Sequence, residues 1–225
     1  MPDAASWPYI IASTIIHFGY YYLLNRSYRL GDLSLVYPVA RGIAPVLVTM
    51  GAALTAGEWL GPLALSGVGA VSLGVIALAT RGAAGGHARA TIGVAIGTGL
   101  MIAAYSVVDG LGVRRSGAPL GYIGWLFIFE IFVAGFVFLH NGHRVWRKAS
   151  VFLPGLVGGL VSAGAYGLVI WAKNVAPLGL VSSLRETSVV FATLIGVVFL
   201  RERPWQRRTA ASLLVLLGAV LIAFA

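Results

Sequence analysis

The stretch LSLVYPVARGIAPVLVTMGAALT, residues 33–55, decides the fold class of this chain. It contains 23 residues and a single charged side chain, Arg41. About 20 mainly apolar residues are enough for a helix to cross the hydrocarbon core of a bilayer, so this stretch predicts a transmembrane helix. Seven further apolar stretches of similar length occur, and we expect eight spans in all. Their predicted bounds are 8–24, 33–55, 60–80, 90–112, 119–139, 151–172, 178–200 and 208–225.

The composition of the whole chain indicates a membrane protein. Of its 225 residues, 59% are hydrophobic and 10% are charged, whereas about 25% are charged in a typical soluble domain. The net charge of +9 comes mostly from Lys and Arg between the apolar stretches, as membrane topology requires, and gives no reason to expect nucleic acid. The apolar runs are too long for barrel strands. We therefore predict an all-α integral membrane protein.

Several other function classes lack their signatures in this sequence. The absence of cysteine excludes disulfides and thiolate metal sites. The chain has no G-x-x-x-x-G-K-[ST] phosphate loop and no G-x-S-x-G nucleophile elbow, so we expect neither ATP-driven pumping nor hydrolysis. His140 and His143 have a metal-like spacing, but two ligands make a poor metal site. We expect no enzyme activity, no metal and no cofactor.

The chain also contains an internal repeat with an offset of 144 residues. The segments 20–81 and 164–225 share ten identities in 62 pairs. Matches between charged residues have the most weight, because charges are rare in this chain. The matched pairs include Arg41 with Arg185, Glu58 with Glu202, Tyr22 with Tyr166, Thr49 with Thr193 and Gly74 with Gly218. An odd number of crossings separates equivalent spans, so the sequence predicts an inverted repeat, an architecture that many secondary transporters use.

Two sequence runs resemble a known family. The run Ser34-Leu-Val-Tyr-Pro-Val-Ala-Arg-Gly-Ile-Ala-Pro45, followed by Gly57-Glu58 and a glycine-rich helix, resembles the drug/metabolite transporter superfamily, EamA type. The run Leu184-Arg-Glu-Thr-Ser188, followed by Leu200-Arg-Glu202, is similar to the same pattern in a second half. The resemblance implies a transporter with two inverted halves of five helices. It also implies that Glu58 and Glu202 pair with a nearby Arg or cap a helix start.

The chain departs from that pattern in its number of helices. Spans 90–112 and 119–139 have no counterpart in the first half, so we expect three helices in an incomplete first repeat, residues 1–80, and five in a second repeat, residues 90–225. We interpret this either as a natural eight-helix variant or as a start inside a longer reading frame. The loop charges place both termini outside the cytoplasm, whereas the resemblance implies cytoplasmic termini, so the orientation stays open.

Charged residues inside the spans are the candidates for function, because a charge at membrane depth costs roughly 2.5–3.5 kcal/mol on insertion scales. Arg41 and Arg185 are the strongest candidates, since they occupy equivalent repeat positions and we expect both to face the bundle interior. Tyr37 shares a helix face with Arg41. Two interpretations are open for the arginines: substrate binding, or internal salt bridges to Glu186, Glu130 or Asp109.

The remaining candidates lie in the aromatic stretch that follows residue 124 and at isolated polar positions. Trp125 and Glu130 are candidate cavity residues, and Glu130 is also either a proton-coupling group or the structural partner of an arginine. His17 is interpreted as a hydrogen-bonded packing residue. Asp109 precedes Gly110 near a predicted span end, which indicates a helix-terminal turn.

The sequence as a whole favours a secondary transporter of a small polar metabolite, anionic or zwitterionic, such as an amino acid or an organic acid. It would work by alternating access between the repeats. The alternative is a non-transporting partner subunit or a truncated relic. The expected partners are the solute and the lipid bilayer, with a homodimer or a second chain as an open alternative. We expect a multi-pass protein of a bacterial inner membrane.

Overall fold

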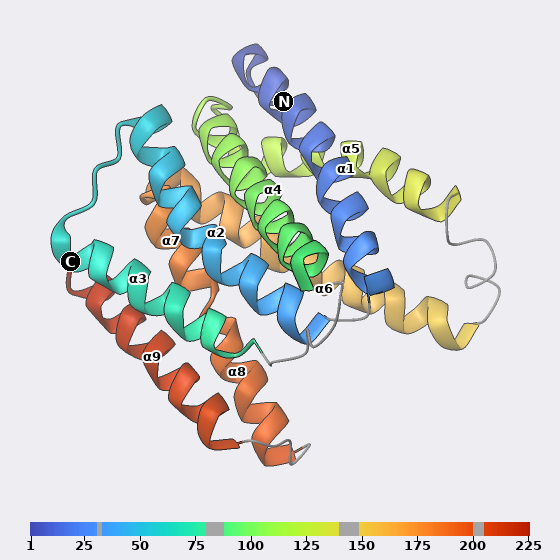
Figure 1. The fold of residues 1–225 in the computed structure, drawn as a ribbon. Coiled ribbons are helices and arrows are strands. Elements are labelled where there is room, and N and C mark those ends of the chain that lie inside the picture. Colours follow the sequence, from blue (N-terminus) through green and yellow to red (C-terminus); the bar gives the residue numbers. More distant parts are fainter. Residues whose placement is uncertain (31–32, 80–87, 140–148, 200–204) are drawn as a thin grey trace. The chain divides into compact units, whose positions relative to one another are not determined.

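The chain is helical throughout its described length (Figure 1). The computed structural model describes residues 1–30, 33–79, 88–139, 149–199 and 205–225, and these ranges contain helices and no strand. The elements are η1 (Ala4–Ser6), α1 (Trp7–Leu30), α2 (Leu33–Ala56), α3 (Pro62–Ala77), α4 (Ala88–Arg114), α5 (Pro119–Val137), α6 (Ala149–Val175), α7 (Leu178–Arg185), α8 (Ser188–Leu194), the π-helical η3 (Ile195–Phe199) and α9 (Trp205–Ala223). The predicted all-α fold class is confirmed.

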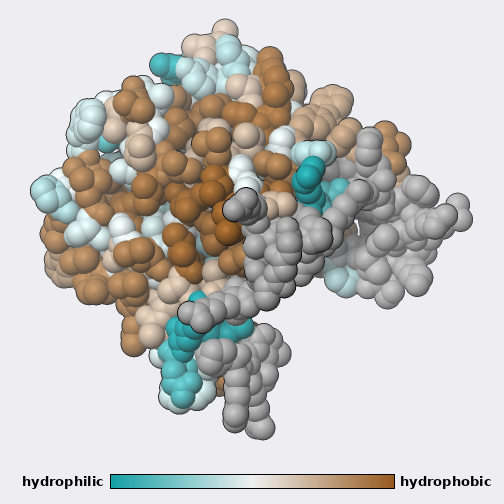
Figure 2. Space-filling model, in the orientation of Figure 1, coloured by the Kyte–Doolittle hydropathy of each residue, from teal (hydrophilic) through white to brown (hydrophobic). Residues whose placement is uncertain are grey.

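The helices follow the predicted spans with two exceptions: α1, predicted to end at residue 24, continues to Leu30, and the seventh span is interrupted. The predicted span 178–200 is divided into α7, α8 and η3. Among the described helices, five are long and apolar enough to cross a membrane: Leu35–Ala56, Ala90–Arg114, Pro119–Phe136, Leu153–Val175 and Trp205–Ala223. The helix α3 is apolar but has 16 residues, and α1 has 24 residues but is too polar for the same criterion. Apolar side chains cover most of the face in Figure 2, as expected for a protein surrounded by lipid.

The helices form two compact units. Unit 1 contains residues 1–21 and 108–176, and unit 2 contains residues 22–107 and 177–225. Each unit therefore combines helices from both predicted repeats. The repeat boundaries themselves, 1–80 and 90–225, stay a prediction.

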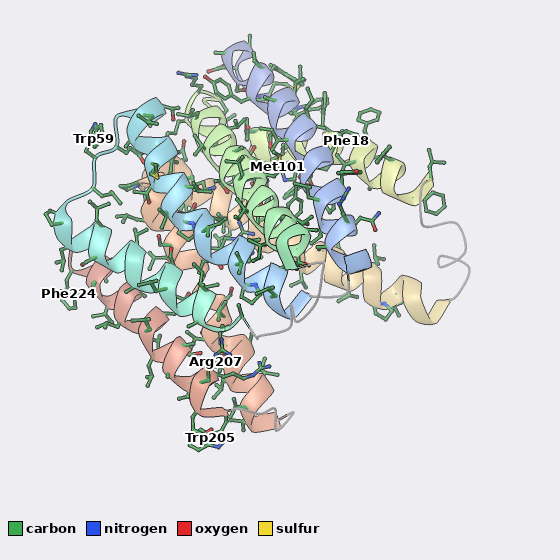
Figure 3. The ribbon with its side chains drawn as sticks, in the orientation of Figure 1. Phe18, Trp59, Met101, Trp205, Arg207 and Phe224 are labelled. Carbon is green, nitrogen blue, oxygen red and sulfur yellow. The ribbon has the colours of Figure 1, made fainter. Side chains whose placement is uncertain are left out.

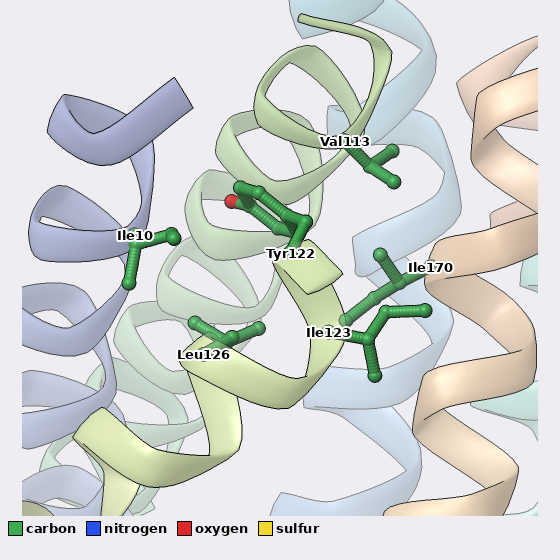
Figure 4. Packing of buried hydrophobic residues seen from close by; sticks show 6 residues of the cluster. All are labelled: Ile10, Val113, Tyr122, Ile123, Leu126 and Ile170. Atoms are coloured by element: carbon green, nitrogen blue, oxygen red, sulfur yellow. The ribbon is translucent and has the colours of Figure 1, made fainter. Parts of the chain in front are cut away.

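Unit 1 has an apolar core to which α1, α4, α5 and α6 all contribute (Figure 4). The buried cluster consists of Ile10, Val113, Tyr122, Ile123, Leu126 and Ile170. Tyr122 is fully buried, and Gly112 of α4 provides the room for it, because a Cβ at Gly112 would collide with the Tyr122 hydroxyl. At the rim of the cluster the rings of Trp7 and Trp125 lie 5.1 Å apart. The core thus holds four helices from distant parts of the chain together.

In unit 2, α3 and α9 pack against each other through small residues. A Cβ added at Gly67 would lie 2.8 Å from the carbonyl oxygen of Gly218, and one at Gly74 would lie 2.9 Å from that of Ala211. The partners run in opposite directions along the two helices, so the packing is antiparallel. An offset of 144 residues converts the first contact into the second, since it maps Gly67 onto Ala211 and Gly74 onto Gly218. This exchange is what a two-fold relation between inverted repeats requires.

The guanidinium group of Arg207 links α3 and α9 through hydrogen bonds at the other end of the helix pair. Arg207, labelled in Figure 3, lies in the first turns of α9. Its Nε donates a hydrogen bond of 2.9 Å to the carbonyl of Ala77, and its Nη2 donates to the carbonyl of Ala79. These carbonyls belong to the C-terminal end of α3, where backbone acceptors lack helical donors. Arg207 therefore provides hydrogen-bond donors for the free carbonyls at the end of α3, in addition to the contribution of its positive charge to membrane topology.

Candidate functional site

Unit 2 contains a buried ion pair between α2 and the residue that follows α7. The Nε of Arg41 lies 2.9 Å from Oε2 of Glu186, and the two side chains are 13% and 3% exposed. The guanidinium also lies over the ring of Tyr37, with Cζ 5.7 Å from the ring centroid. Of the interpretations open for Arg41, the internal salt bridge to Glu186 is therefore present. A charge pair this deep is either structural or part of a site that a charged solute reaches.

The helix is interrupted at the same place. Beyond α7, the N–H groups of Glu186 and Thr187 bond to the carbonyls three residues earlier, those of Ser183 and Leu184. The Thr187 hydroxyl also donates to the Leu184 carbonyl at 2.7 Å, an example of a Thr side chain competing with the helical backbone. The α-helical hydrogen bonding of the seventh predicted span is therefore interrupted by one tighter turn at the acidic partner of Arg41. Discontinuous spans are typical of the substrate and ion sites of secondary transporters.

The backbone of α2 adds a polar group beside the ion pair. Pro45 lies inside α2, and because proline has no N–H, the carbonyl of Arg41 lacks its usual helical donor. One short region of unit 2 thus offers a guanidinium, a carboxylate and a backbone acceptor.

The ion pair also lies where the two predicted repeats meet. Helix α2 crosses α7 in the antiparallel sense, with Thr49 against Gly179 at one end and Arg41 against Glu186 at the other. The offset of 144 maps the pair 41–186 onto the pair 185–42, which is displaced by only one residue on each helix. Arg41 and Arg185 are therefore both adjacent to the point of local two-fold symmetry. Arg185 itself is the last residue of α7 and is partly buried.

The segment after α2 is tied to the start of α7. Gly57 has a φ of +67°, and Glu58 follows it and accepts a hydrogen bond of 2.7 Å from the Leu178 N–H through Oε2. A carboxylate is favourable at a helix N-terminus, where N–H groups lack partners. The predicted capping role of Glu58 is confirmed. Its repeat equivalent Glu202 lies outside the described residues, as do His140 and His143.

The positive φ of Gly57 leads to a testable prediction. The variant Gly57→Ala should lower the stability of the protein by about 1–2 kcal/mol, because a side chain is unfavourable in the left-handed region. Thermal unfolding in detergent, followed by tryptophan fluorescence, measures this loss. Gly61→Ala is the matched control, since Gly61 has a φ of −67° and open space around it. Equal unfolding temperatures for the two variants would contradict the prediction.

Unit 1 contains a second polar cluster, centred on Asp109. Asp109 is fully buried in α4 and accepts hydrogen bonds from the hydroxyls of Tyr122, at 3.3 Å, and of Tyr166. The predicted helix-terminal turn at Asp109 is wrong, because α4 continues to Arg114 and the turn lies at Gly117, whose φ is +60°. The two tyrosine hydroxyls give the carboxylate its partners inside the helix bundle.

His17 and Glu130 face each other in the same unit. His17 is buried in α1, and its Nε2 lies 3.3 Å from Oε1 of Glu130 in α5, whose side chain is 22% exposed. The expected hydrogen bonding of His17 is confirmed by the contact of its Nδ1 with the Ser13 carbonyl at 2.8 Å. Among the described residues, the ion-pair partner of Glu130 is this histidine from α1, so the interpretation of Glu130 as an arginine partner stays a prediction.

Comparison with known proteins identifies the family. The pattern that defines the EamA-like transporter family matches residues 89–224, from α4 to α9. The chain belongs to the EamA-like transporter family. A solved crystal structure, described only as that of a protein, has a TM-score of 0.79 and 20% identity, covering 97% of this chain and 76% of the other. At this identity the likeness shows the fold alone. No curated protein matches the chain.

The family and the apolar helices make this EamA-like protein a multi-pass membrane transporter of small molecules. Of the candidate residues, Arg41, Glu186 and Tyr37 come together in unit 2. Trp125 packs in unit 1 against Trp7, and its Nε1 donates to the Met1 sulfur at 3.2 Å. No group of three or more His, Cys, Asp or Glu side chains that could hold a metal occurs in the described ranges.

Sequence reasoning missed two features of the EamA-like chain: the interruption of the seventh span and the tyrosine partners of Asp109. The polar run Arg185-Glu186-Thr187-Ser188 within an apolar stretch was the available signal for the first. For Tyr166 the signal was its repeat match with Tyr22. Neither signal shows which side chains meet.

Proposed function

We propose that this EamA-like protein is a secondary transporter of a small anionic or zwitterionic metabolite, such as an amino acid or an organic acid. The observation that carries the proposal is the Arg41–Glu186 ion pair at the interruption between α7 and α8. Charged groups are rarely kept at this depth without a functional reason, and interrupted helices supply polar backbone groups to transported solutes.

The ion pair suits a solute that carries both charges. A carboxylate of the solute would bind the Arg41 guanidinium, which has the planar donor geometry for it. An ammonium group would bind Glu186 and the Arg41 carbonyl that Pro45 leaves without a helical donor. In the empty protein the two side chains neutralise each other, so neither charge is left buried alone. Binding of the solute would thus replace the pairing of Arg41 with Glu186 by the pairing of each side chain with a charged group of the solute.

Alternating access is supported by the local symmetry of unit 2. The α3–α9 contacts and the α2–α7 crossing both fit an inverted repeat with the offset of 144 residues. Inverted repeats allow two related conformations that open to opposite sides of the membrane around a fixed site. Helical spans in place of barrel strands favour a bacterial inner membrane as the location.

Transport assays with purified protein in liposomes test the proposal. We expect saturable uptake of a radiolabelled amino-acid or organic-acid pool, stimulated by unlabelled solute of the same class inside the vesicles. Protein-free liposomes and an uncharged sugar are the controls. Uptake no faster than in protein-free liposomes for both pools would overturn the proposed function.

One observation favours a partner chain in addition. Residues 153–162 of α6 are exposed all around the helix, and Gly155, Gly158 and Gly159 have open space where a Cβ would be. Small residues of this kind allow close helix packing in membranes. The proposal of a homodimer or second chain is tested by cross-linking a single cysteine at Leu156 in native membranes. Failure to cross-link above the level of a cysteine at exposed Leu120 would overturn it.

A further inference from the structure

The hydrogen bonds of His17 fix which of its ring nitrogens carries a hydrogen. Nδ1 lies 2.8 Å from the backbone carbonyl oxygen of Ser13 and 3.3 Å from the Ser13 hydroxyl. A carbonyl oxygen only accepts hydrogen bonds, so Nδ1 must be the donor. In the neutral ring, Nε2 then has a lone pair, and this lone pair faces the carboxyl group of Glu130.

The contact between Nε2 and Oε1, at 3.3 Å, therefore requires a proton. Without one, a carboxylate oxygen and a nitrogen lone pair would repel each other. With one added, either the protonated Glu130 donates to Nε2 or the imidazolium donates to the carboxylate. We propose that His17 and Glu130 together form a proton-binding site in unit 1, which takes up one proton between Nε2 and Oε1 and provides the coupling ion for transport.

Tyrosine rings and one further carboxylate surround the pair. The rings of Tyr20 and Tyr21 from α1 lie 6.4 and 6.5 Å from the His17 ring, Tyr166 from α6 is also close to it, and Asp109 from α4 interacts electrostatically with Glu130. The ring of Tyr166 lies 6.3 Å from that of His17, and its hydroxyl binds Asp109. Both carboxylate oxygens of Asp109 accept hydrogen bonds from tyrosine hydroxyls. The negative charge of Asp109 therefore stays near the His17–Glu130 pair and attracts a proton to the pair.

The basic side chains that the structure describes in unit 1 have other positions. Arg114 donates to the carbonyls of Lys173 and Ala176 at the end of α6, and Arg115 lies over the Tyr9 ring at 4.8 Å. Lys173 is fully buried but lies two helical turns beyond Tyr166, about 10 Å along α6. Glu130 is the more exposed member of the pair, with 22% of its side chain accessible against 6% for His17.

Loss of the proton changes the contact between two helices. His17 belongs to α1 and Glu130 to α5, and the deprotonated pair would lose its hydrogen bond and gain a repulsion. Proton binding thus stabilises the conformation in which α1 and α5 meet here. The coupling role rests on the proposed transport function, whereas proton binding itself does not.

Spectroscopy of the full chain in liposomes tests proton binding without a solute. We expect a protonated carboxyl band in the infrared difference spectrum and, in ¹⁵N NMR, the signals of a His17 ring that carries a hydrogen on Nδ1. Glu130→Gln should remove the carboxyl band, and His17→Gln should remove the NMR signal and shift the band. Glu58→Gln, in the other unit, is the matched control and should leave both unchanged. Persistence of the band in Glu130→Gln, or of the Nδ1-protonated ring signal of His17 in His17→Gln, would overturn the proposal.

A second assay tests coupling. An inward proton gradient should accelerate uptake of the amino-acid or organic-acid pool by the wild-type protein, and Glu130→Gln should lose this stimulation while keeping solute exchange. Gradient-driven uptake that is equal in Glu130→Gln would refute coupling through this pair. Absence of any uptake by the wild-type protein would contradict the transport function instead, and the spectroscopic result would still decide whether the proton site exists.

Discussion

Replacement of Arg41 by leucine should abolish solute uptake and destabilise the protein by about 3–5 kcal/mol. The variant removes the counterion that is hydrogen-bonded to Glu186, whose side chain is 3% exposed, and leaves only the weaker attraction of Arg185. Removal of one member of a buried pair is costly because the remaining charge loses its hydrogen-bonded partner and gains no water in exchange. Chemical unfolding in detergent measures the stability, and uptake of the amino-acid or organic-acid pool into liposomes measures the function.

A double variant separates the structural role of the pair from its role in binding. Arg41→Leu with Glu186→Leu removes both charges, so stability should recover to within about 1–2 kcal/mol of the wild type while uptake stays absent. Arg115→Leu is the matched control, since that exposed guanidinium contacts only a tyrosine ring in the described structure and its loss should cost about 0.5–1 kcal/mol. Recovery of uptake in the double variant would show that the ion pair is structural only.

The fold was predictable because apolar length is a direct signal in a membrane protein. A helix must satisfy its own backbone in lipid, so long apolar runs such as residues 33–55 have one available structure. Turn residues marked the ends well: Gly57 ends the α2 region, and Pro62 and Pro119 begin α3 and α5. Two helices continue past their predicted ends through charged residues: α1, predicted to end at residue 24, reaches Leu30, and α4, predicted to end at residue 112, reaches Arg114.

The interruption of the seventh span could not be predicted in the same way. Apolar length reports whether a segment prefers lipid, and it contains no information on the continuity of the backbone. No proline or glycine marks the position between Arg185 and Ser188. The interruption coincides with the attraction of Glu186 to Arg41 and with the Thr187 hydroxyl bond, and the first of these depends on a residue 145 positions away.

The sequence predicted that the buried charges have partners, but it did not predict which residues these partners are. A charge at membrane depth requires a partner, so the pairing of Arg41 with a carboxylate was among the expectations. Which carboxylate it binds depends on how helices pack. Among the described residues, Glu130 therefore pairs with His17, and Asp109 accepts hydrogen bonds from two tyrosines.

The second large effect is expected at the small-residue contact between α3 and α9. A Cβ at Gly218 would lie 2.6 Å from the carbonyl oxygen of Gly67 and 2.8 Å from the Val71 nitrogen. These are backbone atoms, which cannot rotate away as a side chain can. Gly218→Ala should therefore force the helices apart and lower the stability by about 1–3 kcal/mol, with a larger loss for Gly218→Val.

The internal repeat leads to a further prediction for the contact between α3 and α9. Gly74 is the equivalent of Gly218, and a Cβ there would meet the Ala211 carbonyl oxygen at 2.9 Å and the Val215 nitrogen at 3.0 Å. If the two helices are related by a two-fold axis, Gly74→Ala and Gly218→Ala should lower the unfolding temperature by similar amounts. Gly69→Ala is the control, because Gly69 lies on α3 with nothing within 4 Å of an added Cβ. A loss in Gly69→Ala as large as the other two would mean that the stability depends on glycine flexibility in α3 and not on the close approach of the two helices.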